Sequence, residues 1–197
     1  MKVILQLHGG VGYMSRKEVI SKNELLRCAF EQAREEGLTE LTARKLAARA
    51  GCSTQPIFRL YKSMDELVSE VMEHAVGYFE RYYSNAPKDP AAKPFVNLGM
   101  TYISFAKDEP KLFQILFLRK ERQGRSLYEM LNGKAGNVMA EINQAKAAGC
   151  KDPQDLFMQM WIHIHGAASM VITGDFDLND DQTKQMLQNA YNAFSGR

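Results

Sequence analysis

The sequence between residues 41 and 63 is LTARKLAARAGCSTQPIFRLYKS, and a glycine separates two short segments with helical spacing. Thr42 is a candidate N-cap for a helix over residues 43–50, and Gly51 is suited to end that helix. Ser53 is a candidate cap for a second short helix. Two short helices joined by a three-residue turn predict a helix-turn-helix.

The second helix of such a pair enters the major groove of DNA, and its first residues meet the base edges. Here those residues are Ser53, Thr54 and Gln55, which are short and polar. Glutamine can pair with adenine in a bidentate way, and threonine can offer its hydroxyl or its methyl group. The motif therefore predicts a protein that binds double-stranded DNA.

Helical spacing continues on both sides of the motif. Ser21 and Glu24 form a capping box before a helix that ends at Gly37, and Ser63 and Glu66 form another. Further helices are expected over residues 64–84, 91–107, 110–120, 126–148 (with a possible break at Asn132-Gly133), 153–173 and 180–194. The predicted fold is all-α, with a three-helix head joined by a long helix to a helical bundle that dimerises.

This pattern divides the chain into three parts. We expect residues 15–63 to form the DNA-binding domain and residues 64–197 to form a ligand-binding and dimerisation domain. Met14 looks like a natural start, so we interpret residues 1–14 as a leader, non-native in origin and outside the fold. The alternative for that segment is a genuine N-terminal arm.

The residues around the turn resemble the TetR family of transcriptional regulators, and the likeness covers about residues 21–74. It is carried by Leu41 to Ala47, by Gly51-Cys52-Ser53, by Ile57 to Ser63 and by Leu67. The resemblance implies a homodimer, usually a repressor, that binds a palindromic operator and leaves it when a small ligand enters the C-terminal domain. By position, it implies that Arg44 contacts bases and that Thr42, Tyr61 and Lys62 contact the DNA backbone or pack.

Two positions depart from the family pattern. Phe58 stands where the family usually has tyrosine, and Met64 stands where lysine is common, so two phosphate contacts are lost. An alternative therefore stays open, namely a helical interaction protein of the same fold with weak or lost DNA binding. The expected DNA contacts are Thr42, Arg44, Ser53, Thr54, Gln55, Phe58, Arg59, Tyr61 and Lys62.

The charge is distributed unevenly along a chain of 197 residues whose net charge is only +2. Residues 15 to 62 carry 10 Lys and Arg against 6 Asp and Glu, and the remainder carries 15 against 17. A mildly basic N-terminal third fits a module that faces DNA, although chance variation of surface charge would give the same balance.

A second resemblance concerns Trp161-Ile162-His163-Ile164-His165-Gly166, which looks like the W-x-x-x-H-G pattern of one TetR C-terminal subclass. Trp161 and His165 are four residues apart and share a helix face. They would form the wall of a ligand pocket or, as the alternative, part of an ordinary core. The expected ligand contacts are Tyr102, Phe105, Phe113, Phe117, Trp161 and His165, and they suggest a small apolar or aromatic effector.

The segment from Leu156 to Gly174 has no charged residue, and its length suits a membrane span. Its glutamine, histidines, serine and threonine argue against a span and favour a helix buried inside a dimer. Dimerisation is therefore expected through the last two helices. The expected contacts are Gly166, Ala167, Met170, Thr173 and Gly174 on one helix and Leu187, Ala190, Tyr191 and Phe194 on the other.

The alternative of an enzyme that uses His163 or His165 as a general base has little support in the sequence. The sequence offers no nucleophile motif, glycine-rich phosphate loop or carboxylate pair to work with either histidine. The three cysteines are far apart and form no C-x-x-C pair, which gives no support for zinc. We expect no catalytic residue, metal or cofactor, and a cytoplasmic protein with reduced thiols.

Overall fold

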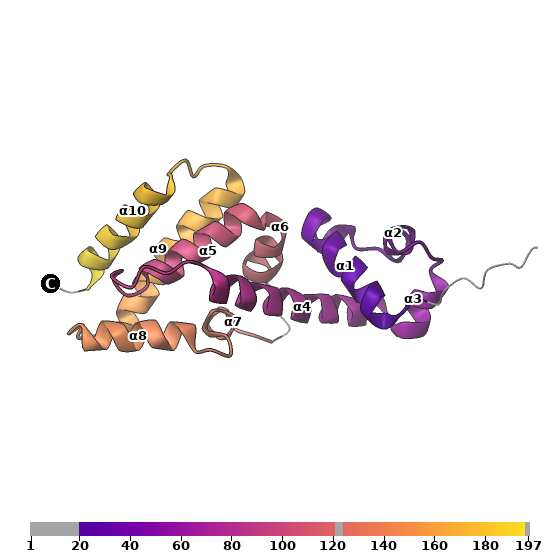
Figure 1. Ribbon diagram of the computed structural model, residues 1–197, viewed down its shortest axis with the longest axis horizontal. Helices are drawn as coiled ribbons and strands as arrows, with labels where there is room; N and C mark the ends of the chain where they lie inside the picture. The colour runs from indigo at the N-terminus through magenta and orange to yellow at the C-terminus, as the bar shows by residue number, and fades with distance from the viewer. Residues whose placement is uncertain (1–19, 121–123, 196–197) are drawn as a thin grey trace, which may run out of the picture.

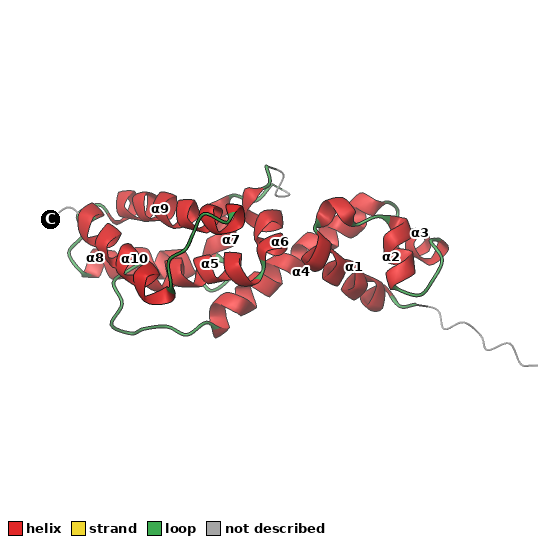
Figure 2. Ribbon diagram, turned by 90° about the horizontal axis from the view of Figure 1, so that it is seen from above, coloured by secondary structure: helices red, strands yellow, loops and turns green. Residues whose placement is uncertain are grey.

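The computed structural model describes residues 20–120 and 124–195, and every regular element in these ranges is helical (Figure 1 and Figure 2). A small head and a larger body are joined by one long helix. The head contains α1 (Lys22–Glu36), the 3₁₀ turn η1 (Leu38–Glu40), α2 (Ala43–Arg49) and α3 (Gln55–Leu60), and α4 (Met64–Asn85) runs from it into the body. The body contains α5 (Val96–Asp108), α6 (Pro110–Phe113) with the π-helical turn η2 (Gln114–Leu118), α7 (Leu127–Asn132), α8 (Asn137–Ala147), α9 (Pro153–Thr173) and α10 (Asp180–Phe194).

The head is held by caps and by a small core. The Thr42 hydroxyl accepts a hydrogen bond from the Lys45 backbone N–H at 3.3 Å, as the sequence predicts. Leu46 of α2 and Ile57 of α3 are completely buried in the core that α1 and the first half of α4 also supply. Gly51 has a φ of 65°, a left-handed conformation that favours glycine and turns the chain between the two helices.

The body is built around α5, which packs against α9 and α10 on one side and against α4 on the other. Gly99 makes the closest part of this packing possible. A Cβ atom at this position would lie 2.9 Å from the Leu187 side chain and 3.0 Å from the Ile164 side chain. Any larger residue at position 99 would therefore push α9 or α10 away from α5.

The expected starts of two helices need correction. The helix expected from residue 91 begins at Val96, because the preceding Phe95 is left-handed with a φ of 66°. The Phe95 N–H donates to the buried Glu141 carboxylate at 2.6 Å instead of entering a helix. The helix α3 begins at Gln55, without a cap from Ser53, so the turn after α2 is longer than three residues.

The expected dimer contacts on α10 are also partly wrong. Leu187, Ala190 and Tyr191 are buried within the protomer, where α10 packs on α5 and α9. The apolar stripe of α10 therefore serves the core of the chain itself. The break expected near Gly133 is present, since α7 ends at Asn132 and α8 begins at Asn137.

One ion pair ties the head to the body. Arg34 of α1 donates from Nε and from a terminal nitrogen to the two carboxylate oxygens of Glu109, at 2.8 and 2.5 Å. The Tyr78 hydroxyl of α4 donates to the same carboxylate at 2.6 Å. The Glu109 side chain is 8% exposed, so its charge depends on these donors rather than on water. We call this group of three the Arg34–Glu109–Tyr78 latch.

Glu109→Gln is expected to lower the free energy of unfolding by about 2 kcal/mol at pH 7, because a hydrogen-bonded charge is replaced by a neutral amide. Burial raises the pKa of Glu109, but hydrogen bonds from Arg34 and Tyr78 outweigh burial and hold the pKa below its ordinary value of 4.5. A carboxyl with a depressed pKa stabilises the fold above its unfolded pKa and loses this effect as the pH falls through its folded pKa.

Urea unfolding of the wild type and of this variant between pH 7 and pH 3 measures the effect. The difference between the two proteins should shrink as the pH falls below 4.5. A difference that is independent of pH would show that the latch does not depend on the Glu109 charge.

Candidate functional site

The helix α3 lies at the end of the head farthest from the body (Figure 1). Ser53, Thr54 and Gln55 at its beginning are exposed, and Phe58 is 53% exposed. Ile57 lies on the opposite side of α3 and is buried. The helix therefore turns a polar start and one aromatic ring outward, in the orientation that a major-groove helix requires.

The basic residues of the head divide into two groups. Lys45 forms ion pairs with Glu36 and Glu40, at 3.1 and 2.6 Å. Arg49 forms a bidentate ion pair with Glu35, in which each guanidinium nitrogen lies 2.7 Å from a carboxylate oxygen. The hydrogen bonds that Lys45 and Arg49 donate to these carboxylates raise the pKa of both basic side chains. Both cations are neutralised by neighbouring acids of the head.

The second group is free to meet an anion. Arg44, Arg59 and Lys62 are exposed, and no acidic side chain of residues 20–120 and 124–195 forms an ion pair with any of them. They lie on α2, on α3 and directly after α3. A phosphate backbone approaching α3 would meet these three cations first.

Tyr61 differs from the other residues of the expected DNA contact set. Its side chain is 1% exposed, and its hydroxyl donates to Glu70 of α4 at 3.0 Å. The Lys22 ammonium lies 4.8 Å from the centre of the Tyr61 ring. Of the two roles that the resemblance implies for Tyr61, the structure places it in packing between α3 and α4.

The six aromatic residues expected at a ligand pocket lie together in the body. Tyr102 is at their centre, with ring centroids 5.0 Å from Phe113, 4.8 Å from Phe117 and 4.9 Å from Trp161. The Tyr102 hydroxyl lies 3.0 Å from His165 Nδ1. Trp161 and His165 stack at 5.3 Å, which confirms that they share a face of α9. These side chains fill the centre of the body.

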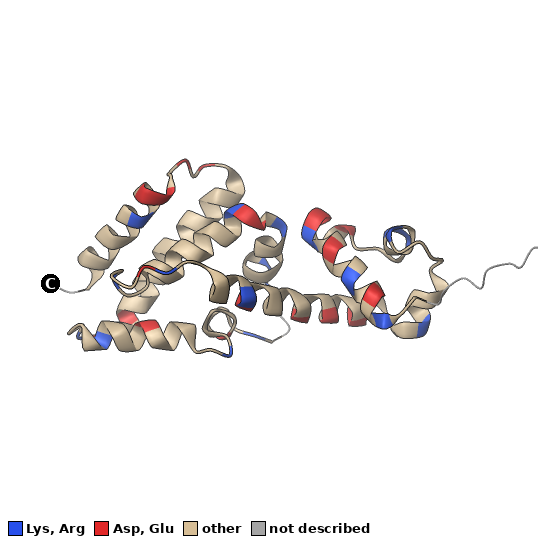
Figure 3. Ribbon diagram, in the orientation of Figure 1, with Lys and Arg blue, Asp and Glu red and all other residues tan. Residues whose placement is uncertain are grey.

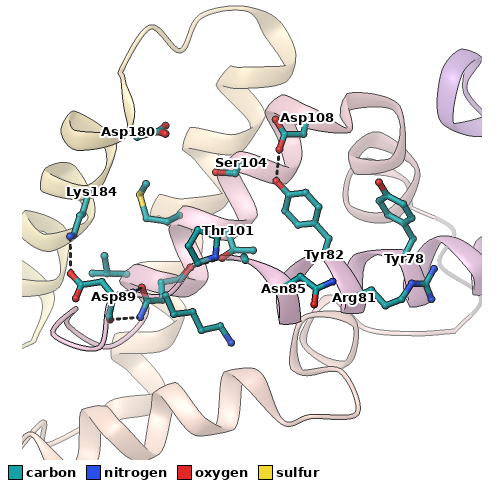
Figure 4. A pocket seen from close by; sticks show the side chains of 16 residues that line it. Tyr78, Arg81, Tyr82, Asn85, Asp89, Thr101, Ser104, Asp108, Asp180 and Lys184 are labelled. Carbon is teal, nitrogen blue, oxygen red and sulfur yellow. Dashed lines mark hydrogen bonds and ion pairs between the residues drawn. The ribbon is translucent and has the colours of Figure 1, made fainter.

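A separate cleft of about 910 Å³ lies between α4, the loop after α4, α5 and α10 (Figure 4). Its lining includes Tyr78, Tyr82, Met100, Ser104 and Asp108, and none of the six aromatic residues lines it. Sequence reasoning missed this cleft. The available signal was the spacing of Tyr78 and Tyr82, which are one helical turn apart on α4.

A three-helix head with an outward helix-turn-helix, on a long helix that enters a helical body, defines a DNA-binding transcriptional regulator. Two family models match the chain. Residues 25–71 match bacterial regulatory proteins of the tetR family, and residues 95–194 match the tetracyclin repressor-like C-terminal domain. The chain belongs to the TetR family. This membership agrees with the expectation that the protein is not an enzyme.

Solved structures share the fold at low sequence identity. A protein described as a TetR-family transcriptional regulator from Vibrio parahaemolyticus has a TM-score of 0.63 and 18% identity, covering 87% of this chain and 97% of that chain. A TetR-like transcriptional regulator from Rhodococcus sp. RHA1 has a TM-score of 0.60 and 17% identity, covering 89% of this chain and 96% of that chain. A comparison with curated proteins finds no significant match.

The described residues contain no group of three histidine, cysteine or acidic side chains that could hold a metal ion. No helix among them is both long and apolar enough to cross a membrane.

The division of the cations predicts different effects for two arginines of α2. Arg44→Ala should weaken DNA binding about tenfold, because a free guanidinium is lost from the DNA-facing end. Arg49→Ala is the matched control and should change affinity less than about twofold, because Glu35 already neutralises that residue. Fluorescence anisotropy with a labelled DNA duplex measures the affinity of both variants. Equal losses in the two variants would contradict the division.

Proposed function

We propose that the protein is a ligand-responsive transcriptional repressor that binds a palindromic operator as a homodimer. The observation that carries this proposal is the outward end of the head. There the polar start of α3 stands beside three cations that have no acidic partner in the described part of the chain. Residues 15–63 would contact DNA, and residues 64–197 would bind the ligand and dimerise. A cytoplasmic location follows from this function.

Base reading is assigned to the start of α3. Gln55 and Thr54 would contact bases, with Arg44 beside them, while Thr42, Ser53, Arg59 and Lys62 would contact phosphates. Phe58 would bring an apolar ring against a thymine methyl group, because it stands exposed on the same helix. Tyr61 would hold α3 in place by packing between α3 and α4.

Selection from a random pool of duplex DNA tests this function. The expected product is a palindrome, because a two-fold dimer reads each half-site in the same way. Gln55→Ala should change the preferred bases at one position of each half-site. Lys62→Ala should weaken binding to all DNA sequences equally and reduce the slope of log affinity against log salt concentration by about one.

The alternative function predicts a different result from the same experiment. An interaction protein that has lost DNA binding would enrich no sequence and would show no salt-dependent affinity for duplex DNA. Phe58 and Met64 are the two departures from the family pattern that favour this alternative. Enrichment of a palindrome would exclude it.

A second copy of the chain is the proposed partner of α9. The outward face of this helix carries Met158, Ile162, Gly166 and Met170, and Ile162 is 65% exposed. No charged residue occurs on α9 after Asp155, as the tan ribbon of Figure 3 shows. A long exposed face without charge fits a C2 interface, in which each copy of α9 meets its equivalent and α10 flanks it.

Ile162→Glu is expected to convert a dimer into a monomer, because each C2 interface would then bury two uncompensated carboxylates. Sedimentation velocity at micromolar concentration measures the change. Met139→Glu is the matched control, since Met139 is similarly exposed but lies on α8. A monomeric wild type, or a dimer that survives Ile162→Glu, would exclude this interface.

The ligand response is proposed to involve α4, because this helix is shared by head and body. The aromatic residues Tyr102, Phe105, Phe113, Phe117, Trp161 and His165 would contact an apolar or aromatic effector that opens the cluster. A ligand can shift DNA affinity only by the difference between its affinities for the two states of the protein.

A further inference from the structure

The cleft between α4, α5 and α10 has the size and the composition of a ligand site. Its volume of about 910 Å³ lies within the range of small-molecule pockets. Val96 and Met100 of α5 give it apolar surface, and the rings of Tyr78 and Tyr82 line it from α4. Thr101 and Ser104 add hydroxyls from α5 (Figure 4).

Most of the charged groups around the cleft already have partners. Lys184 is paired with Asp89 at 2.8 Å, and Asp180 is paired with Lys107 at 3.3 Å. The Lys88 ammonium lies 4.7 Å from the centre of the Tyr83 ring. Arg81 extends away from Tyr82 and Asp108 in Figure 4. Lys184 and Lys88 are therefore already engaged by groups of the protein itself.

Asp108 is the exception among the carboxylates. It forms no ion pair with any residue that the structure describes, and one of its oxygens accepts a hydrogen bond from the Tyr82 hydroxyl at 2.5 Å. A carboxylate can accept several hydrogen bonds, so Asp108 retains acceptor capacity toward the cleft. An unpaired carboxylate beside an aromatic ring matches a positively charged group attached to an apolar body.

Asp108 is directly connected to the Arg34–Glu109–Tyr78 latch. Tyr82 and Tyr78 are one turn apart on α4, and they donate to Asp108 and Glu109, which are consecutive residues at the end of α5. Glu109 in turn holds Arg34 of the head. A group that binds Asp108 therefore acts one residue away from the contact that sets the position of the head.

The geometry points to the cleft as the binding site of an amphipathic organic cation, with Asp108 as its counter-ion and the Arg34–Glu109–Tyr78 latch as the connection to the head. This site is separate from the aromatic cluster to which the effector is assigned above, because none of those six residues lines the cleft. Only the connection to the head rests on the proposed DNA-binding function. The cation would pair with Asp108 and lie beside the Tyr82 ring, with its apolar part against Met100 and Val96.

Isothermal titration of the full chain with two probes that share a naphthalene ring tests the site. The probes are 1-naphthylmethylammonium and 1-naphthoate, which differ in the sign of their charge. The ammonium should bind about tenfold more tightly, or better, because only this probe can pair with Asp108. Equal binding of the two probes, tighter binding of the naphthoate or no binding of the ammonium would overturn the inference.

Three variants separate charge pairing from simple packing. Asp108→Asn keeps the shape of the side chain and should weaken binding of the ammonium probe about tenfold. Asp177→Asn is the control, because Asp177 is exposed and lies outside the cleft lining, and it should leave this binding unchanged. Tyr82→Phe keeps the ring and the Asp108 charge but removes the hydroxyl that donates to Asp108, so it should weaken binding less than Asp108→Asn does. A tenfold loss in Tyr82→Phe, with unchanged binding in Asp108→Asn, would show a packing site and overturn the assignment of the counter-ion.

The connection to the head is tested by repeating DNA binding with saturating 1-naphthylmethylammonium. DNA affinity of the wild type should change about fivefold or more, and Glu109→Gln should bind the cation but lose this change. If the cation binds without any effect on DNA affinity, the cleft is a cation site, but the proposed connection to the head is wrong. If the cation does not bind but the protein still selects a palindrome, the site is wrong and the proposed function stands.

Discussion

The arrangement of head and body depends on the charge of Glu109. This carboxylate lies at the end of α5, almost out of contact with water, and it is stabilised by Arg34 of α1 and Tyr78 of α4. Removing either donor would leave a buried charge with an incomplete set of partners, which is costly. The position of α1 relative to α5 is therefore set by a directional contact as well as by apolar packing, and α4 contacts both helices.

The same balance of charges defines the DNA-facing end of the head. Its net positive charge is small, but the acidic residues are grouped on α1 and η1, where they neutralise Lys45 and Arg49. The cations without such partners stand next to the start of α3. Local pairing, more than the total charge, decides which surface attracts phosphate, because a neutralised cation contributes little at physiological ionic strength.

Local sequence signals predicted most of the helices, since capping residues, glycines and helical spacing act within one or two turns. The start of α5 was predicted too early because its true start depends on Glu141, which is 46 residues from Phe95 and holds its N–H. The inward stripe of α10 was mistaken for an interface for a similar reason. Periodicity shows that one face of a helix is buried but does not show whether the chain itself or a second copy covers it.

The candidate sites show the same limit. The residues at the start of α3 could be identified from the motif, whereas the pairing of Lys45 and Arg49 depends on acids brought close by folding. The cleft was not predicted, because its lining comes from α4, α5 and α10, which are distant in sequence. The tyrosine pair on α4 connects this cleft to the contact between head and body. Tyr78 and Tyr82 donate to consecutive carboxylates at the end of α5, so a ligand that moves Asp108 would also move Glu109, and the latch would respond to binding in the cleft.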